Sequence, residues 1–593
     1  MRNADTVLTI IRERGKKQLP LERSYRLLYN TERYLRAYAR LYPKKGAMTR
    51  GITTETVDQM SQAKIERLID AIRHERFSWT PTKRIYIPKK NKKLRPLGLP
   101  TWTDKLLQEV LRSILEAYYE PQFSPCSHGF RPERGCHSAL TEIQQQWTGT
   151  RWLIEGDIAK YFDTINHEVL MEMLGKDVHD NRFLQLISNL LQAGYMEEWT
   201  FHKTLSGTPQ GGVLSPLLSN IYLNKFDQYV EKILVPAYTQ GNRRRENLAY
   251  GRISGTLKRM KQRGQKEGVK ALLQQRRQLP SSDPNDPAYR RLRYIRYADD
   301  FALGLVGTHA DAEEIKRRIK EYLRDELKLD LSDEKTLITH ATTQKARFLG
   351  YHISNQQANS KTTTNTNRIK KRSVNGRIGW HVPPDVLEKK CAPYLKEGKP
   401  IHRPEMQHES DFAIVSYYQQ VYRGIVQYYI LAHNVAVLGK LRYIMKNSLL
   451  KTLAGKHKTT RSAMRRKYQT MTKTEEGKTL QCLEVRVERE GKSPLIARFG
   501  GISLTRTPMA TLNDTPYVDK NSRSELLDRL RADRCELCQS TKKVEVHHIR
   551  KLADLNIQGR SEAPEWKKRM AAMHRKTLIL CQSCHGKLHA GTL

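Results

Sequence analysis

Residues 293–305 read RYIRYADDFALGL, in which two apolar runs flank the adjacent acids Asp299 and Asp300. Runs rich in Tyr, Ile, Phe and Leu predict two strands, with the acids at the turn between them. A third acid, Asp157, ends the apolar run of RWLIEGDIAKYF at residues 151–162, where we expect a buried strand. The sequence therefore predicts an α/β fold in which a sheet brings three carboxylates together.

These three acids, which we call the carboxylate trio, predict a site for divalent cations. Carboxylates among apolar residues are unfavourable without a cation, because burial penalises an unpaired charge. Mg²⁺ prefers carboxylates and substrate phosphates, and phosphoryl transfer from a nucleoside triphosphate uses two such ions about 4 Å apart. Asp also favours turns, so the YADD sequence alone is equally consistent with an exposed turn. Asp157 upstream and the glycine turn PQGG at residues 209–212 favour the metal site.

The composition indicates a polyanionic partner. The 593 residues include 105 Lys plus Arg against 62 Asp plus Glu, a formal charge of +43. Such a charge favours nucleic acid first and an anionic membrane surface second. The N-terminus carries charges and no apolar run approaches about 18 residues, which argues against a secreted or membrane-embedded protein. We therefore expect a cytoplasmic protein with no membrane partner and about three to five domains.

Eight segments indicate a family. In chain order they are KKGAMTRGITTETVDQMS, IPKKNKKLRPLGLPTWTDKLLQ, SHGFRPERGCHSAL, EGDIAKYFDTI, GTPQGGVLSPLLSNIYLN, RYADDFALG, LSDEKT and ARFLGY. In content and order they resemble the group II intron-encoded reverse transcriptases, also called maturases, over nearly the whole chain. The resemblance implies a multidomain α/β right-hand polymerase, with fingers, an antiparallel palm sheet and an α-helical thumb (the maturase X region).

The resemblance also implies roles for residues around the trio. Asp157, Asp299 and Asp300, helped by the backbone carbonyl of Ile158, would hold two Mg²⁺ ions.

On the nucleotide side, Phe162 would abut the sugar 2′ carbon and favour deoxynucleotides, although a plain core aromatic is the alternative. Lys89 and Arg95 would grip the triphosphate, Arg95 with a bidentate fork. Gln210 would lie beside the nucleotide sugar and base. The choice of Lys89 stays open, because other lysines of the same hairpin are equally placed: Lys90, Lys92 and Lys93.

Two CxxC pairs near the C-terminus predict a structural metal site. They are CELC at residues 535–538 and CQSC at residues 581–584, with 42 residues between the inner cysteines. Four thiolates close a tetrahedral structural Zn²⁺ site, and this spacing is typical of zinc knuckles rather than of a disulfide framework. The predicted ligands are Cys535, Cys538, Cys581 and Cys584.

Four histidines accompany these cysteines. The pattern VEVHHI followed by LILCQSCHGKLH resembles the HNH (ββα-metal) nucleases, in the form appended to many group II intron proteins. By that resemblance His547, His585 and His589 hold a catalytic divalent metal and His548 is the general base. Lys576–Thr577 stands where many HNH nucleases have Asn, and a non-catalytic zinc knuckle that binds DNA is the alternative.

The expected organisation has five parts. They are an N-terminal extension (1–80), reverse transcriptase fingers and palm (81–355) with a basic insertion at about 241–293, a thumb (356–490), a DNA-binding region (491–530) and the HNH domain (531–593). The insertion holds 15 Lys or Arg and 4 Asp or Glu. We expect it to be partly helical, and it is either a solvated linker or an appendage that contacts RNA.

The thumb leaves two further choices open. Its tyrosines would either form a helical core or stack on bases; they are Tyr417, Tyr418, Tyr422, Tyr428 and Tyr429. Its cations would either be solvated or follow an RNA backbone; they are Lys451, Lys456, Lys458, Arg461, Arg465 and Arg466.

The resemblance implies one multifunctional enzyme. It would bind group II intron RNA, assist splicing, nick target DNA and reverse-transcribe the intron with dNTPs from the DNA 3′ end. An RNA-binding splicing cofactor without significant polymerase activity is the first alternative, and a stand-alone HNH endonuclease is the second. We expect a bacterial-type ribonucleoprotein, with an organellar location and a homodimer left open.

Overall fold

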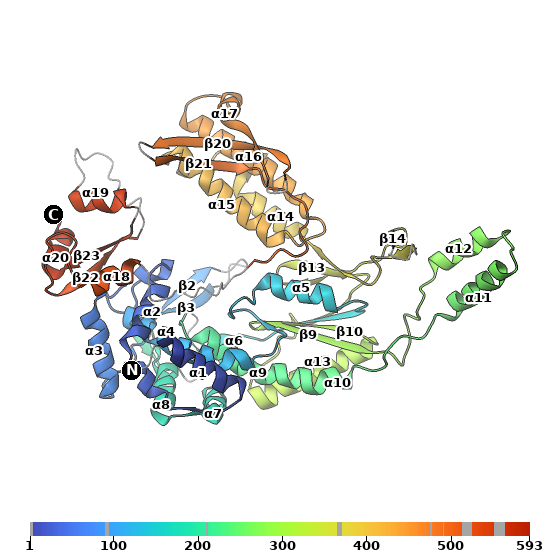
Figure 1. Ribbon diagram of the computed structural model, residues 1–593, viewed down its shortest axis with the longest axis horizontal. Coiled ribbons are helices and arrows are strands. Elements are labelled where there is room, and N and C mark those ends of the chain that lie inside the picture. Colours follow the sequence, from blue (N-terminus) through green and yellow to red (C-terminus); the bar gives the residue numbers. More distant parts are fainter. Residues whose placement is uncertain are drawn as a thin grey trace.

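We analysed a computed structural model of the chain (Figure 1). The structure describes residues 4–88, 94–204, 206–208, 211–364, 370–474, 477–489, 492–512, 525–550, 555, 564–573 and 575–592. Among these residues, no helix is both long enough and apolar enough to span a bilayer.

A five-stranded sheet lies at the centre of the polymerase motifs, in the order β11–β5–β10–β9–β4. Its strands are β4 (Ser127–His128), β5 (Trp152–Asp157), β9 (Arg291–Tyr297), β10 (Asp300–Val306) and β11 (Leu337–His340). The pairs are antiparallel except for β4 with β9, which is parallel. The strand–turn–strand expected at YADD and the strand expected before Asp157 are therefore present, as neighbours.

The apolar residues of this sheet are buried in two cores. One, which includes Ile154 and Leu303, also includes the N-terminal helices. The other includes Leu153, Ile295 and Ala302. The helices of this part are α1 (Ala4–Lys16), α2 (Thr31–Leu41), α3 (Gln62–Arg73), α4 (Trp102–Tyr119), α5 (Cys136–Gln146), α6 (Tyr161–Thr164), α7 (His167–Asp177), α8 (Asn181–Gln192), α9 (Ser215–Tyr229) and α13 (His309–Leu327). Their apolar residues recur at helical spacing, so burial against the sheet stabilises both layers.

A second sheet follows the predicted basic hairpin. Strands β2 (Thr82–Pro88) and β3 (Leu94–Leu99) pair antiparallel, and β7 (Tyr195–Glu197) and β8 (Thr200–His202) extend the sheet in the order β3–β2–β7–β8. The residues that link β2 to β3 lie outside the described ranges, as does Lys89.

The basic insertion forms two helices, α11 (Leu248–Gln262) and α12 (Val269–Gln278), that extend away from the rest of the molecule (Figure 1, right). Only Leu257 is buried among the residues of these two helices. The expectation of a partly helical insertion is confirmed.

Residues 346–500 contribute most of the second hydrophobic core, which also includes residues of α5 and of the five-stranded sheet. A sheet in the order β12–β13–β16 (Ala346–Phe348, Tyr351–Asn355, Ile378–His381) leads to helices α14 (Pro384–Cys391), α15 (Asp411–Tyr429), α16 (Leu438–Lys456) and α17 (Arg461–Tyr468). A three-stranded sheet then packs on α15; its strands are β19 (Gln469–Lys473), β20 (Thr479–Arg489) and β21 (Lys492–Gly500). The expected boundary at 490/491 falls between the paired strands β20 and β21.

The tyrosines of α15 mainly form this core. Tyr418 and Tyr422 are fully buried and Tyr429 nearly so, whereas Tyr417 is 40% exposed. Tyr428 is partly buried and packs against the same core, so the core interpretation holds for four of the five tyrosines.

The C-terminal module lies against the N-terminal helices (Figure 1, left). It comprises α18 (Glu525–Arg531), the antiparallel pair β22 (Val544–His548) and β23 (Thr577–Cys581), α19 (Glu565–Ala572) and α20 (Gln582–Ala590). Leu526, Leu527 and Val546 of this module belong to the same core as α2 and α3. The module is thus joined to residues more than 480 positions earlier in the chain.

Candidate active sites

The central sheet brings the carboxylate trio together. Asp300 begins β10 directly opposite Asp157 at the end of β5, and Asp299 lies in the turn just before β10. Burial, then repulsion by the other two carboxylates, raises the pKa of Asp300 to about 7, and burial also raises the pKa of Asp299. The Lys335 ammonium lies 2.7 Å from a carboxylate oxygen of Asp157. These half-buried acids, with one lysine as neutralising charge, have the chemistry of a site for divalent cations.

A buried ion pair supports the turn that carries the trio. Ala298 has a left-handed φ of 55°, and its carbonyl accepts a 2.8 Å hydrogen bond from Arg296. The Arg296 guanidinium also contacts both carboxylate oxygens of Asp227 on α9, and both side chains are fully buried. The hydroxyl of Tyr294 donates to the same carboxylate at 2.7 Å. This network fixes the strand before the turn, so it positions the acids without touching them.

The described residues beside and within the glycine turn, Gly207, Thr208 and Gly211, make close backbone contacts. Thr208 donates its backbone N–H to the Phe162 carbonyl at 2.8 Å, and a Cβ at Gly207 would lie 2.6 Å from that same carbonyl oxygen. Gly211 has a φ of +115°, and a Cβ there would lie 2.5 Å from the backbone oxygen of Gly98 on β3. Glycine is required at both contacts, because a side chain would collide with backbone.

The predicted nucleotide-binding residues are only partly described. Arg95 on exposed β3 lies near enough to Asp299 to favour its ionised form. Phe162 is half-buried and packs edge-on against Tyr161, with 5.3 Å between ring centroids. Ile158 is buried and bridges to Leu331. Lys89 and Gln210 lie outside the described residues.

Arg131, in the segment SHGFRPERGCHSAL, is a structural residue. It is 4% exposed and donates to the carbonyls of Ser124 and Ser127 and to the carboxylate of Glu120. Its guanidinium is therefore committed to the protein interior rather than presented to a template.

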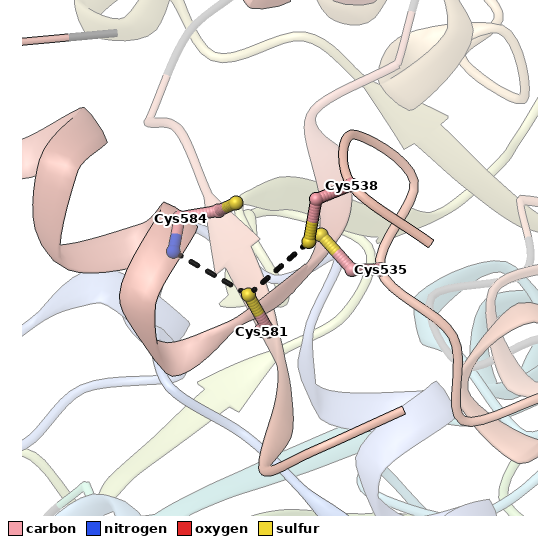
Figure 2. Close-up of side chains that lie close together, drawn as sticks. All are labelled: Cys535, Cys538, Cys581 and Cys584. Atoms are coloured by element: carbon pink, nitrogen blue, oxygen red, sulfur yellow. Dashed lines mark hydrogen bonds between the residues drawn. The ribbon is translucent and has the colours of Figure 1, made fainter. Parts of the chain in front are cut away.

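The four cysteines converge near the C-terminus (Figure 2). Their Sγ atoms lie within 4.8 Å of one another, and the Cys538 and Cys581 sulfurs are 3.6 Å apart. A Zn–S distance of about 2.3 Å places tetrahedral ligands about 3.8 Å apart, so this spacing fits a zinc ion. All four are free cysteines. The donor set is the one that structural zinc sites use.

The predicted histidine ligands form a second cluster. We call His547, His585 and His589 the histidine cluster; neighbouring nitrogens are 3.0 Å apart for His547 and His585, and 2.9 Å apart for His585 and His589. His585 uses its other nitrogen, Nδ1, to contact Glu545 at 2.6 Å. That contact directs Nε2 of His585 into the cluster, as an outer-sphere carboxylate does at metal sites.

Asp58 joins this cluster from the loop before α3, and sequence analysis missed it. Its carboxylate oxygens lie 3.1 Å from His589 Nε2 and 3.5 Å from His585 Nε2, and one accepts the backbone N–H of His548 at 2.8 Å. Burial alone would raise the pKa of Asp58 and lower that of His585. Hydrogen bonds within the cluster outweigh burial, so the pKa of Asp58 falls to about 2 and that of His585 rises to about 9. Asp58 stands 490 positions from His548. It lies within the segment KKGAMTRGITTETVDQMS at residues 44–61, which indicated the family but carried no sign of a contact with the histidines.

His548 is enclosed by the N-terminal region. Its Nε2 lies 2.8 Å from the hydroxyl of Tyr38 on α2, and the two rings meet edge to face. The residue is 5% exposed, and burial lowers its pKa to about 3. His548 pairs in register with Thr577, the position at which the sequence departs from many HNH nucleases.

Family models match three regions of the chain. The family model for reverse transcriptase (RNA-dependent DNA polymerase) matches residues 87–353, that for type II intron maturase matches 386–502, and that for AI2M/AI1M-like HNH endonuclease matches 535–585. The group II intron-encoded protein LtrA of Lactococcus lactis subsp. cremoris is 38% identical over 95% of both chains. The chain belongs to the group II intron-encoded reverse transcriptase/maturase family.

Other relatives cover the chain to different extents. The putative COX1/OXI3 intron 1 protein of Saccharomyces cerevisiae is 31% identical over 95% of this chain and 68% of its own length. Protein YkfC of Escherichia coli is 35% identical over 56% of this chain and 84% of its own length. This group II intron-encoded protein is therefore a reverse transcriptase, a splicing maturase and an HNH endonuclease in one chain, and the interpretation as a stand-alone HNH endonuclease is wrong.

Proposed function

We propose that the chain copies intron RNA into DNA at the carboxylate trio. In this assignment the sheet β11–β5–β10–β9–β4 and its helices are the palm, the hairpin β2–β3 belongs to the fingers, and α15–α17 form the thumb. The observation that carries the proposal is the register of β5 with β10, in which Asp157 and Asp300 are direct partners with Asp299 beside them.

The trio would hold two Mg²⁺ ions, together with the carbonyl of Ile158. Such ions would supply activation of the primer 3′ hydroxyl and charge neutralisation of the leaving pyrophosphate. Lys335 would release Asp157 when a cation replaces its ammonium. Arg95 would contact the triphosphate, with Lys89 and Gln210 as further proposed contacts, and Phe162 would exclude the 2′ hydroxyl of ribonucleotides.

The C-terminal module would nick the second DNA strand. The four cysteines would hold a structural Zn²⁺, and the histidine cluster would hold the divalent ion that polarises the scissile phosphate. His548 would take the proton from the attacking water. We propose that the resulting nick provides the 3′ end from which the trio extends DNA on the intron RNA.

The partners follow from this sequence of reactions. Group II intron RNA, target DNA and dNTPs are the proposed substrates, within a cytoplasmic ribonucleoprotein. The exposed cations of α16 and α17, and those of the α11–α12 insertion, would contact RNA phosphates. A homodimer remains a proposal without a described interface.

Primer extension on an RNA template with dNTPs and Mg²⁺ tests the polymerase assignment. We expect Asp299→Ala to abolish synthesis while RNA binding is retained, because the variant removes a proposed metal ligand. Asp325→Asn, a surface carboxylate that pairs with neighbouring Arg324 on α13, is the matched control. Near wild-type synthesis by Asp299→Ala would refute the site, and RNA binding without synthesis by the wild type would favour the splicing-cofactor alternative.

A further inference from the structure

The histidine cluster is completed by a carboxylate from a distant part of the chain. The two oxygens of Asp58 lie 3.1 Å from His589 Nε2, 3.5 Å from His585 Nε2 and 3.6 Å from His547 Nδ1. All four donor groups lie within 4.8 Å of one another. Ligands at about 2.0–2.1 Å from a tetrahedral ion lie about 3.4 Å apart, so these four donors have the spacing of a complete coordination shell.

We propose that Asp58 is the fourth ligand of the ion held by the histidine cluster. The ion then fastens the nuclease module to the N-terminal region and closes the nuclease site. This inference rests on the proposed nuclease role of the cluster and goes beyond it, because it assigns a ligand outside the HNH module and a resting state to the enzyme.

The nuclease site would be closed because the ion would have four protein ligands. Structural zinc sites have four protein ligands, whereas catalytic sites have three and leave the fourth position for water or substrate. Asp58 occupies the position that a water or a DNA phosphate would need. Tyr38 meanwhile contacts Nε2 of His548, the atom proposed to accept the proton. Two side chains of the N-terminal region thus block the nuclease site: Asp58 fills the open position on the metal, and Tyr38 occupies the nitrogen of His548 that would accept the proton.

The contact around the cluster is an extended interface. Val546 on β22 donates its N–H to the Met60 carbonyl at 2.8 Å and accepts the N–H of Gln59 at 3.0 Å. Arg531 on α18 pairs with Glu32 on α2 at 2.6 Å. Leucines of α18 and Val546 are buried in the shared core. Asp58 lies next to the paired backbone, so a bound ion would tighten an interface that is already formed.

An ion can still reach the cluster. His589 is half-exposed, with 52% of its side chain accessible, and it lines a groove of about 810 Å³ between α3 and α20. Lys64 and Arg67 of α3 line the same groove. The cluster is therefore open to metal on one side, whereas His548 is shielded on the other.

The affinity for zinc tests the assignment of Asp58 as a ligand, and this measurement requires no enzymatic activity. Full-length protein that carries one zinc on its cysteines would be titrated with Zn²⁺ against a competing chelator. We expect Asp58→Asn to weaken the second zinc by about 10-fold or more, since even outer-sphere changes at metal sites cost about 10- to 100-fold. Asp70→Asn is the matched control, because Asp70 lies on α3 and pairs with Arg76 at the surface.

Amide hydrogen exchange tests whether the ion holds the nuclease module to the N-terminal region. The second zinc should slow amide exchange at residues 57–60 and 544–548 in the wild type and in Asp70→Asn, but not in Asp58→Asn. Equal zinc affinity, or equal zinc-dependent protection, in Asp58→Asn and the wild type would overturn the proposal. The wild-type response to zinc is informative on its own if the variant does not fold.

Nicking of a supercoiled plasmid tests closure. We expect Asp58→Asn to nick several-fold faster than the wild type, because an open coordination position is restored. Slower nicking by Asp58→Asn would make Asp58 a catalytic ligand and overturn the closed state. If no variant nicks DNA while the zinc and exchange differences persist, the ligand assignment is upheld and the endonuclease role of the cluster is what fails.

Discussion

At the scale of single residues, Phe162 tests the nucleotide side of the polymerase site. The residue is half-buried, and its backbone carbonyl anchors the glycine turn through Thr208. If its ring excludes the 2′ hydroxyl, Phe162→Ala removes the obstacle and leaves the backbone contact in place. We expect incorporation of ribonucleotides relative to deoxynucleotides to rise by about 10-fold or more, which corresponds to about 1.4 kcal/mol. Primer extension with each nucleotide class measures the ratio, and an unchanged ratio would assign Phe162 to the core alone.

The sequence predicts the carboxylates of the polymerase site, but it does not predict the N-terminal residues that contact the nuclease site. Asp157, Asp299 and Asp300 stand in motifs, and the apolar runs around them predict the strands that bring them together. Asp58 stands in a quoted segment that points to the polymerase family, and Tyr38 stands in none; both reach the nuclease site only because two distant modules share a core. Sequence periodicity carries no information about that docking, so neither residue could be predicted.

At the scale of secondary-structure elements, Asp411 joins the three helices proposed as the thumb. It lies at the start of α15. Its carboxylate accepts hydrogen bonds from Lys456 at the end of α16, from His457 directly after that helix and from Tyr468 of α17. Burial alone would raise its pKa, but these bonds outweigh burial and lower the pKa to about 2 from 3.8. The ionised carboxylate therefore stabilises the contact between the helices.

The lowered pKa sets the direction of a pH effect. A depressed carboxyl pKa contributes stability above the unfolded-state value, and the contribution is lost as pH falls from about 4 towards 2. We expect Asp411→Asn to lower the local unfolding free energy of α15 by about 1–2 kcal/mol at neutral pH and to flatten its dependence on pH in that window. Amide hydrogen exchange across residues 411–429 measures both effects.

The control for this variant is a surface ion pair of the same region. Asp385→Asn removes the contacts with Arg347 and Lys389, which should cost at most about 1 kcal/mol. Equal losses of protection in the two variants would show that Asp411 does not join the helices.

Some helices and strands could be predicted from the sequence, and others could not. The strands β5, β9 and β10 follow from clear apolar runs. The sheet β19–β21 was not expected, because its strands alternate with many charged residues, as in TLQCLEVRVER, and only one face is buried. Polar alternation of this kind resembles a solvated basic stretch until a partner surface, here α15, is known.

At the scale of the whole molecule, the charge of +43 predicts binding that depends strongly on salt. If about six to ten phosphates are neutralised, RNA affinity should fall by about 10³- to 10⁵-fold between about 50 and 200 mM salt. A filter-binding series with single-stranded RNA measures the slope of log K against log salt. A flat plot would contradict an electrostatic interface.

The central claim is that one chain carries two separate active sites. Its most direct test measures primer extension and DNA nicking on the same three proteins: the wild type, Asp299→Ala and His548→Ala. We predict that Asp299→Ala loses extension and keeps nicking, whereas His548→Ala loses nicking and keeps extension. Loss of both activities in either variant, or of neither, would contradict the assignment of the carboxylate trio and the histidine cluster to separate reactions.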